Sequence, residues 1–200
     1  MDNDDVKIIE KKTLYHGHLT LDEIQLQHKK FHGGWTDPIK REVIQRVHAV
    51  GVLPYDPVRD EVVLIRQFRI GVWAAQQNPW LVETVAGLVE ENETPEDVAC
   101  RESIEEAGCV LTELHHICDY YSSPGMLRER VSMYCGLTDT TNAGGIHGLQ
   151  VEDEDIEAIA IPWEAMQQKI NDKKCLDAKI IFAMNWLANE RECLRKRFTA

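Results

Sequence analysis

Several features that mark other classes of protein are absent from this sequence. Its six cysteines never form a C-x-x-C pair, so neither a zinc site nor a redox centre of that type is indicated. No apolar run approaches the ~20 residues of a membrane-spanning helix. The N-terminus lacks the basic start and apolar core of a signal peptide. We therefore expect a cytoplasmic protein without a membrane partner, whose cysteines are buried thiols rather than disulfides.

Positive charge is also scarce, because Lys and Arg number 22 against 34 for Asp and Glu, which gives a formal net charge of −12. This balance argues against nucleic acid or an anionic membrane as the main partner. An anionic small molecule would need cations to bridge it to the protein. Internal repeats and low-complexity linkers are absent as well. With 44% hydrophobic and 28% charged residues, the composition is that of an ordinary globular domain.

Hydrophobic periodicity predicts many strands and a few helices. We expect strands at residues 6–26 (as a pair), 39–46, 48–55, 61–69, 81–86, 114–121, 130–137 and 156–161. The Asp56-Pro57 turn between two apolar runs predicts a hairpin. We expect one helix in the middle of the chain, one opened by Pro162, and one near residues 177–189. This order favours a layered α+β domain.

The most distinctive stretch is an acidic helix with clearly marked ends. Thr94 followed by a proline predicts its start, because a hydroxyl caps free N–H groups and proline suits the first helical position. Gly108 predicts its end. Within it, Glu102 and Glu106 lie one above the other with Glu105 beside them. The helix therefore carries three carboxylates on one face.

Two interpretations of these carboxylates are open. Acidic helix faces are often simply solvated. Here, however, an apolar run ends at Ala86 and Gly87, where a tight turn would bring a backbone carbonyl up to the acidic side chains. An all-oxygen site of this kind suits Mg²⁺ or Mn²⁺ and not zinc. A metal site is therefore the more specific hypothesis.

The spacing of seven residues in this stretch resembles the signature of the Nudix hydrolases. These residues are Gly87, Glu93, Arg101, Glu102, Glu105, Glu106 and Gly108. So many fixed positions are far more specific than a single glycine motif. The resemblance implies an α/β/α sandwich around a mixed β-sheet, in the α+β class, with an N-terminal strand pair. It also implies two regions: residues 1–47, a β-strand region that forms a homodimer, and residues 48–200, the Nudix domain.

Further similarity extends over nearly the whole chain and points to the ADP-sugar branch of that family. It covers residues 40–43, the 56–65 hairpin, residues 123–125 and residues 145–149. Pro124 stands sixteen positions after Gly108, where that branch carries its marker proline. The resemblance implies Mg²⁺-dependent hydrolysis of ADP-ribose to AMP and ribose 5-phosphate. The alternatives are another nucleotide sugar, such as GDP-mannose, or a nucleotide sensor without catalysis, which the complete set of carboxylates disfavours.

The resemblance also implies roles for individual residues. The metal ligands would be the Ala86 carbonyl, Glu102, Glu106 and, as an additional ligand, Glu105. The substrate would be bound by Arg69 at a phosphate, Arg41 and His18 at the adenine, Glu129 at the terminal ribose, and Pro124.

A general base is expected in the glycine-rich loop that ends in acidic residues. Matching of positions with the Nudix family selects Glu152 as this base, with Glu154 as the second candidate. Glu105 is a further catalytic carboxylate by the same resemblance. A solvated acidic loop is the alternative interpretation. His147 in the same loop is expected to be a structural hydrogen-bonding residue.

Overall fold

The computed structural model describes residues 4–46 and 48–198, and for Glu152 only the backbone. The described residues form two compact units. One combines the N-terminal region up to His48 with residues 120–131, and the other combines residues 49–119 with the chain from residue 132 onward. The boundary that we predicted at residue 47 lies outside the described residues and stays a prediction.

The first unit is built on a three-stranded antiparallel sheet in the order β1-β2-β3. Its strands are β1 (Val6–His16), β2 (Thr20–His28) and β3 (Ile39–Gln45). The predicted strand pair is therefore joined by β3 in one sheet. All 11 residues of β1 are exposed. The 120–131 segment is held to β3 by backbone hydrogen bonds from Ile44 N–H to Met126 and from Arg128 N–H to Ile44.

The second unit is organised around an eight-stranded sheet with the main order β10-β11-β5-β4-β9-β8, in which β6 pairs with β5 and β7 with β4. The strands are β4 (Ala49–Asp56), β5 (Glu61–Phe68), β6 (Trp80–Glu83), β7 (Val85–Leu88), β8 (Glu113–Tyr121), β9 (Arg130–Leu137), β10 (Gly145–His147) and β11 (Ile156–Pro162). β4 and β5 pair directly only beside their hairpin turn, at Tyr55 with Val62 and Asp56 with Glu61. Beyond that point β7 pairs with β4 and β6 with β5.

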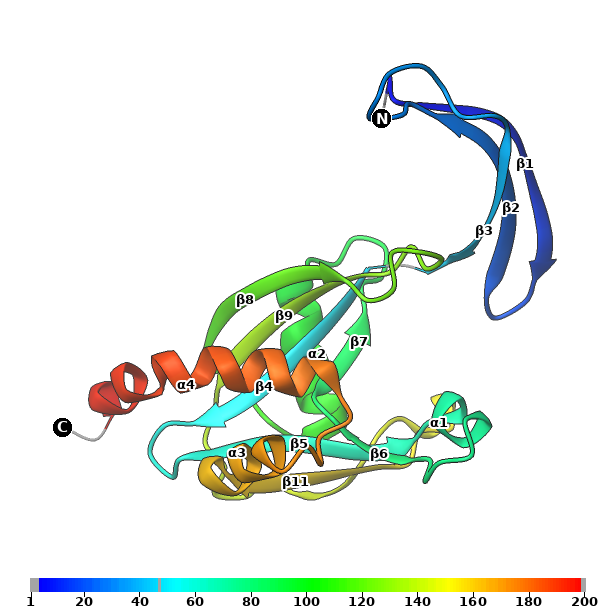
Figure 1. Cartoon of the computed structure of the whole chain (residues 1–200). Coiled ribbons are helices and arrows are strands. Elements are labelled where there is room, and N and C mark those ends of the chain that lie inside the picture. The colour runs from blue at the N-terminus through cyan, green and yellow to red at the C-terminus, as the bar shows by residue number, and fades with distance from the viewer. Residues whose placement is uncertain (1–3, 47, 199–200) are drawn as a thin grey trace. The chain divides into compact units, whose positions relative to one another are not determined.

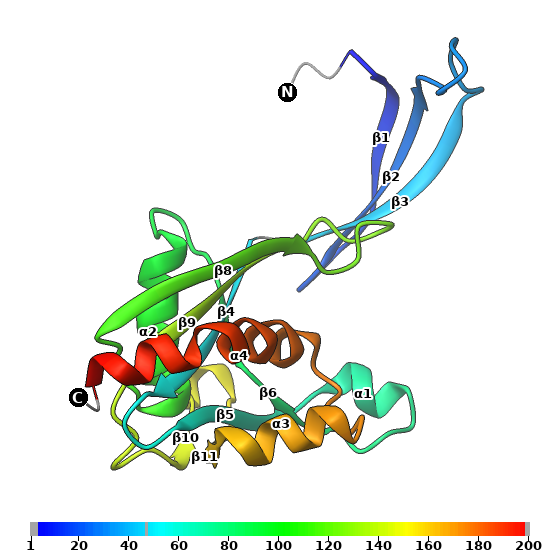
Figure 2. The ribbon, with the colours of Figure 1, turned by 60° about the vertical axis from the view of Figure 1, so that its left-hand side comes forward.

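Helices cover both faces of this sheet (Figures 1 and 2). They are α1 (Ile70–Ala74), α2 (Pro95–Ala107), the short 3₁₀ helix η1 (Gln150–Glu152), α3 (Trp163–Asn171) and α4 (Ala178–Phe198). In both views α2 lies on one face of the sheet, with α3 and α4 on the other. The α+β class and the α/β/α arrangement expected from the sequence are therefore confirmed.

The alternation of side chains along β4 explains how one strand serves both layers. Val50 and Val52 are buried in a cluster with Val98 and Ala99 of α2. Between them, Gly51 faces α4, because a Cβ atom there would lie 3.2 Å from Lys179 Cδ. Since side chains of a strand alternate between its faces, β4 contributes to the core on both sides.

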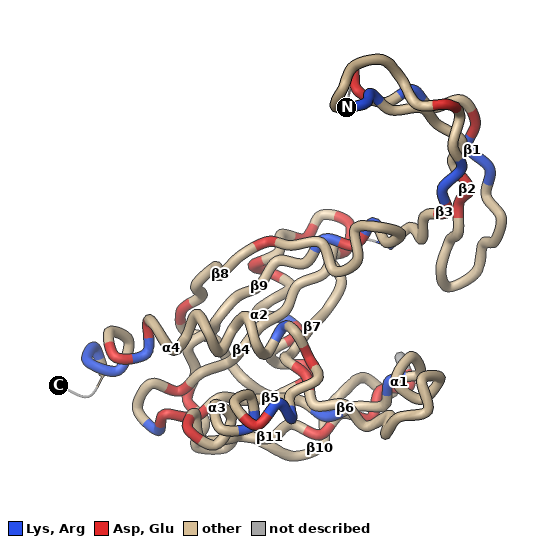
Figure 3. The backbone as a smooth tube through the Cα atoms, viewed as in Figure 1, with Lys and Arg blue, Asp and Glu red and all other residues tan. Residues whose placement is uncertain are grey.

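Three differences from the predicted elements have physical causes. α4 extends to Phe198 rather than to residue 189, and its last turn carries Arg195, Lys196 and Arg197 (Figure 3), which favour the negative end of the helix dipole. The sequence predicted only a glycine-rich loop where β10 and η1 lie. Each of these elements has three residues, which are too few to show a periodic pattern. α1 contains no buried residue and so leaves no amphipathic signal.

The six cysteines are free thiols, as expected, but only Cys109 and Cys135 are buried, while Cys100 and Cys193 are exposed. Among the described residues, no helix is both long enough and apolar enough to cross a membrane.

Candidate active site

Helix α2 begins and ends where its capping residues predict. The Thr94 side chain accepts a hydrogen bond from the Asp97 N–H, and the Asp97 carboxylate accepts from the Thr94 N–H, so the two form a reciprocal capping box. Gly108 adopts the left-handed conformation with φ 64°, which a residue with a side chain rarely adopts. These local signals set the start and end of the helix that carries the three glutamates.

Arg101 organises the acidic side chains around it. It donates to Glu93 at 2.9 Å, to Glu102 at 2.7 Å and to Glu105 at 3.0 Å. The predicted pairing of Arg101 with Glu105 is thus present. The hydrogen bond to Glu93 is the main reason why the pKa of Arg101 is raised further, so this guanidinium stays charged. It partly neutralises a helix face that would otherwise repel an anionic substrate.

Glu106 connects α2 to strand β7. Its side chain is buried, and its Oε2 accepts a hydrogen bond from the Ala86 N–H at 2.9 Å. In a strand, the N–H and C=O of one residue point to the same side. The Ala86 carbonyl therefore also faces away from β4 and toward the carboxylates of α2, as a ligand at this position would need to.

Glu102 lies directly against the neighbouring glycine. A Cβ atom on Gly87 would stand 1.8 Å from Glu102 Oε1, so no other residue fits here without displacing the carboxylate. Absence of a side chain allows close backbone approach. Ala86, Gly87, Glu102 and Glu106 thus form a compact cradle of oxygen atoms, hereafter the α2 cradle.

Both carboxylates of the α2 cradle are perturbed. Burial raises the pKa of Glu106 to about 8; the Ala86 N–H and the charge of Arg69 act against burial, while the charges of Glu102 and Glu154 add to it. Burial likewise raises the pKa of Glu102 to about 7, against the charge and hydrogen bond of Arg101, with Glu105 and Glu154 adding to the rise. A cation placed between them would restore their ionised forms.

The donor set fits a hard divalent cation. Among the described residues, no three His, Cys, Asp or Glu side chains already stand together at metal-binding distance. Mg²⁺ sites commonly use only one or two carboxylates, with water and substrate phosphate completing the shell. Glu102, Glu106 and the Ala86 carbonyl meet that requirement.

Arg69 stands at the end of β5 and contributes positive charge to the site. Its Nε donates to Glu83 Oε2 at 2.6 Å, and its charge lowers the pKa of Glu106. An arginine has five N–H donors, so four remain beyond the one given to Glu83.

The acidic loop is joined to α2 through its backbone. The Gly148 N–H donates to the Glu105 carbonyl at 3.2 Å, and the Leu149 N–H donates to Glu154 Oε2 at 3.2 Å. The charge of Glu154 raises the pKa of both Glu102 and Glu106. The side chain of Glu152 lies outside the described residues.

His147 of the same loop makes a structural contact. Its Nε2 lies 3.1 Å from the Gly144 carbonyl, and its ring covers Gly108, where a Cβ would lie 2.8 Å from it. The geometry agrees with the expected structural role.

The remaining residues that the sequence predicted to bind substrate belong to the first unit. His18 is exposed between β1 and β2, and Arg41 is exposed on β3. Glu129 accepts from the Ser122 hydroxyl at 2.7 Å and lies 3.3 Å from Arg46. Pro124 lines a hollow of about 330 Å³ with Val43 of β3. The structure thus groups these four residues in one unit and the predicted metal ligands and general bases in the other.

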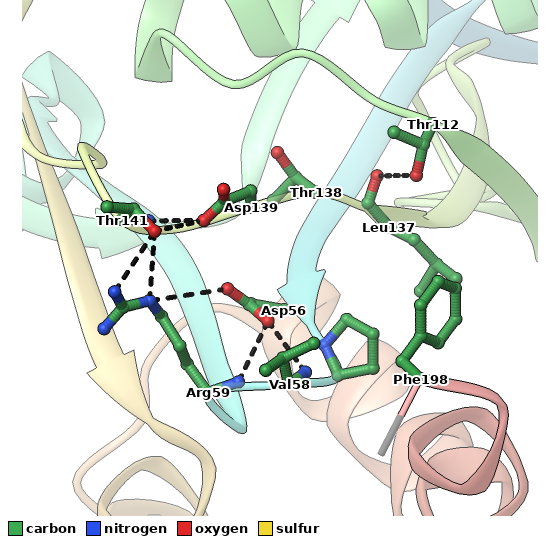
Figure 4. A pocket seen from close by; sticks show the side chains of 10 residues that line it. Asp56, Val58, Arg59, Thr112, Leu137, Thr138, Asp139, Thr141 and Phe198 are labelled. Carbon is green, nitrogen blue, oxygen red and sulfur yellow. Dashed lines mark hydrogen bonds and ion pairs between the residues drawn. The ribbon is translucent and has the colours of Figure 1, made fainter. Parts of the chain in front are cut away.

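A separate cavity of about 400 Å³ lies beside the β4–β5 hairpin (Figure 4). Asp56 is buried there and accepts from the backbone N–H groups of Val58 and Arg59, which stabilises the turn. Arg59 donates to Thr141, and Phe198 closes one side. None of the predicted site residues lines this cavity, so we interpret it as a feature of the hairpin and not as the reaction site.

Sequence reasoning did not identify Glu83, Asp177 and Lys179. Glu83 and Asp177 are buried, and Glu83 pairs with the predicted phosphate-binding Arg69. The available signal was a glutamate inside the otherwise apolar run at residues 81–86. A charge in such a run is rarely buried without a partner.

Comparisons with known proteins identify the family of this chain. The NUDIX domain matches residues 45–181. The chain is 42% identical over 194 residues to an ADP-ribose pyrophosphatase of Escherichia coli, spanning 97% of this chain and 93% of that protein. It is 34% identical over 149 residues to a GDP-mannose pyrophosphatase of Salmonella typhimurium, spanning 74% of this chain and 77% of that protein.

A solved structure of an ADP compounds hydrolase shares the fold, with a TM-score of 0.69 and 18% identity, over 93% of this chain and 96% of that one. The chain therefore belongs to the NUDIX family. The resemblance to Nudix hydrolases that the sequence indicated is confirmed.

Proposed function

We propose that this protein is a divalent-metal-dependent diphosphatase that hydrolyses ADP-ribose to AMP and ribose 5-phosphate. The observation that carries the proposal is the α2 cradle, in which the buried Glu106 and the half-buried Glu102 lie against a strand backbone. It occurs in a NUDIX chain that is 42% identical, over almost its full length, to an ADP-ribose pyrophosphatase.

The chemistry follows from charge. A diphosphate repels an incoming nucleophile, and bound Mg²⁺ would supply neutralisation of that charge and a water of lowered pKa. Glu102, Glu106 and the Ala86 carbonyl would hold the cation, with Glu105 as an additional ligand; Mn²⁺ suits the same oxygen donors. Arg69 would bind a phosphate oxygen through its terminal nitrogens while Glu83 fixes its Nε.

A carboxylate of the acidic loop would orient and deprotonate the attacking water. Glu152 is the first candidate on position, and Glu154 is the second, supported by its electrostatic effect on Glu102 and Glu106. Glu105 is the third, since it lies on the same helix face.

Arg41 and His18 would contact the adenine, and Glu129 and Pro124 would contact the terminal ribose. We propose that these groups act in a homodimer joined through the N-terminal strands. We also place the protein in the cytoplasm, since its six cysteines are free thiols.

The second candidate is hydrolysis of GDP-mannose. The 34% identity to a GDP-mannose pyrophosphatase favours it, but that similarity covers 74% of the chain against 97% for the ADP-ribose pyrophosphatase.

The test is product release from a panel of nucleotide sugars at equal concentration. We expect AMP from ADP-ribose with the highest kcat/KM, loss of turnover in EDTA, and recovery on adding Mg²⁺. Faster release of GMP from GDP-mannose would replace the first substrate assignment with the second. Turnover that persists in EDTA would contradict the role of the α2 cradle.

A further inference from the structure

A series of ion pairs links the start of α4 to Arg69. Lys179 Nζ lies 3.0 Å from Asp177 Oδ1 and 3.4 Å from Glu83 Oε1, and Glu83 Oε2 accepts from Arg69 Nε at 2.6 Å. The exposed fractions of the side chains are 18% for Lys179, 7% for Glu83 and 6% for Asp177. Charges buried to this degree are retained only when paired. Each buried charge in this series is therefore stabilised by the opposite charges beside it.

Asp177 also ties α4 to the strand that carries the α2 cradle. Its Oδ1 accepts the Lys179 N–H in the first turn of α4, and its Oδ2 accepts the Thr84 N–H. Thr84 is fully buried at the junction between β6 and β7, just before Ala86 and Gly87. A displacement at the start of α4 would thus reach both the cradle and Arg69.

Strand β4 leaves room for the lysine. A Cβ atom at Gly51 would lie 3.2 Å from Lys179 Cδ, so a larger residue would crowd the side chain of the lysine. Gly51 stands opposite Ala86 in the β4–β7 register. The lysine side chain therefore passes over Gly51 on the α4 face of the sheet, opposite α2, to reach Glu83.

We propose that Lys179 is a positioning residue for substrate binding, acting through Glu83 on Arg69. The inference rests on the proposed function, in which Arg69 binds the diphosphate. If Glu83 paired only with Arg69, its negative charge would offset the positive charge of Arg69. Because Glu83 also pairs with Lys179, the positive charge of Arg69 stays available to attract the substrate. Two cations balance two anions in the cluster, so loss of Lys179 leaves one net negative charge beside an anionic ligand.

The experiment compares Lys179→Met, Lys179→Arg and Lys174→Met in steady-state turnover of ADP-ribose. In Lys179→Met, KM should rise about tenfold, since an uncompensated charge nearby weakens anion binding by that order. kcat should change by less than about threefold, because Arg69 would contact the substrate equally in the ground state and in the transition state. Lys179→Arg should restore KM, because a guanidinium retains the charge and reaches both carboxylates.

Lys174→Met is the matched control, since it removes the same charge from an exposed lysine paired with Asp172 at the surface. It should leave both constants at the wild-type values. An equal rise of KM in this control would assign the effect to net charge and overturn the proposal. So would a folded Lys179→Met variant with wild-type KM and only a lowered melting temperature.

Lys179→Met leaves two buried carboxylates without their cation and can fail to fold. The double variant Lys179→Met with Asp177→Asn removes one charge of each sign, and the asparagine carbonyl can still accept the Thr84 N–H. KM should still rise, by about fivefold, because Glu83 then pairs with Arg69 alone and offsets its charge. A wild-type KM in this variant also overturns the proposal.

Calorimetric binding of ADP-ribose in EDTA separates this inference from the proposed function. Binding without turnover in Mg²⁺ would contradict the function, and the tenfold weaker Kd expected for Lys179→Met would still support the inference. Equal Kd values with normal wild-type turnover would overturn the inference alone. Absence of both binding and turnover in the wild type would overturn both.

Discussion

Glu106 is the residue on which the metal assignment depends most. Burial raises its pKa to about 8, yet its Oε2 still accepts the Ala86 N–H. An ionised carboxylate in such a place is stable only if a cation accompanies it. By itself an ionised carboxylate there is unfavourable for the fold, which is why we propose that it serves a bound cation.

We expect Glu106→Gln to lower turnover by at least about two orders of magnitude while the fold is retained. The glutamine carbonyl can still accept the Ala86 N–H, and the variant no longer carries a buried charge, so its melting temperature should stay the same or rise. Turnover at saturating Mg²⁺ and thermal unfolding are the measurements. Glu91→Gln, on an exposed loop position, is the control. Near-normal turnover of Glu106→Gln would remove it from the metal site.

The choice between Glu152 and Glu154 as general base is a second question at this scale. We expect Glu152→Gln to lose about 10²-fold in kcat with little change in KM, because a general base acts mainly in the transition state. Glu154→Gln should lose much less, and its new amide oxygen can still accept the Leu149 N–H that the carboxylate binds. Steady-state kinetics of the two variants decide. The reverse order would make Glu154 the base, and normal kcat in both would direct attention to Glu105.

At the scale of elements, the β4–β5 hairpin is joined to the helices by Asp60. Its carboxylate accepts from Tyr55 Oη at 2.8 Å and from Arg195 at 2.9 Å, and forms a close bidentate pair with Arg191. Its carbonyl accepts the Trp163 N–H at 2.9 Å, and Arg191 lies 4.3 Å from the centre of the Trp163 ring. One residue therefore fixes both α3 and α4 against the turn.

This contact predicts a pH-dependent stability. Burial alone would raise the pKa of Asp60, but the hydrogen bonds from Arg191 and Tyr55 and the nearby arginine charges outweigh it, so the pKa lies below its ordinary value. Stabilisation by a carboxylate with a depressed folded pKa is present above the unfolded value, ~3.9, and is lost as the pH falls through the folded value.

We expect Asp60→Asn to reduce the free energy of unfolding by about 2 kcal/mol at pH 7. The difference from the wild type should shrink below about pH 4. Asparagine tolerates the positive φ of 61° at this position, so backbone strain does not contribute. Denaturant unfolding at several pH values measures this, with Asp172→Asn as a surface control. A difference that does not vary with pH would show that the charge is not responsible.

At the scale of the whole molecule, the first unit raises the question of assembly. Strand β1 is an edge strand whose 11 residues are all exposed, among them the large apolar Ile8 and Tyr15. Long exposed edges and apolar strands normally find a partner.

We therefore expect a homodimer in solution, with a light-scattering mass near twice the 22.9 kDa of the chain. Truncation of residues 1–36, which removes β1 and β2 but keeps Arg41, should give a smaller species with weakened binding of ADP-ribose. A fully active preparation with a mass near 22.9 kDa would contradict this expectation.

The sequence by itself determined the features that depend on local geometry. Helix ends follow from neighbouring caps, so Thr94 and Gly108 marked α2 correctly, and helical spacing placed Glu102 and Glu106 on one face. The fixed spacing of the acidic stretch was also enough to indicate the family, because it lies within one short stretch of the chain.

Only the tertiary structure decided which residues distant in the sequence pair with the buried carboxylates. Lys179 and Glu83 are separated by 96 positions, and Arg191 and Asp60 by 131, so no local pattern predicts either pair. The raised pKa values of Glu102 and Glu106 result mainly from burial. Burial is produced by strands and loops far away in the sequence, and it is what perturbs the carboxylates on which the proposed cation site depends.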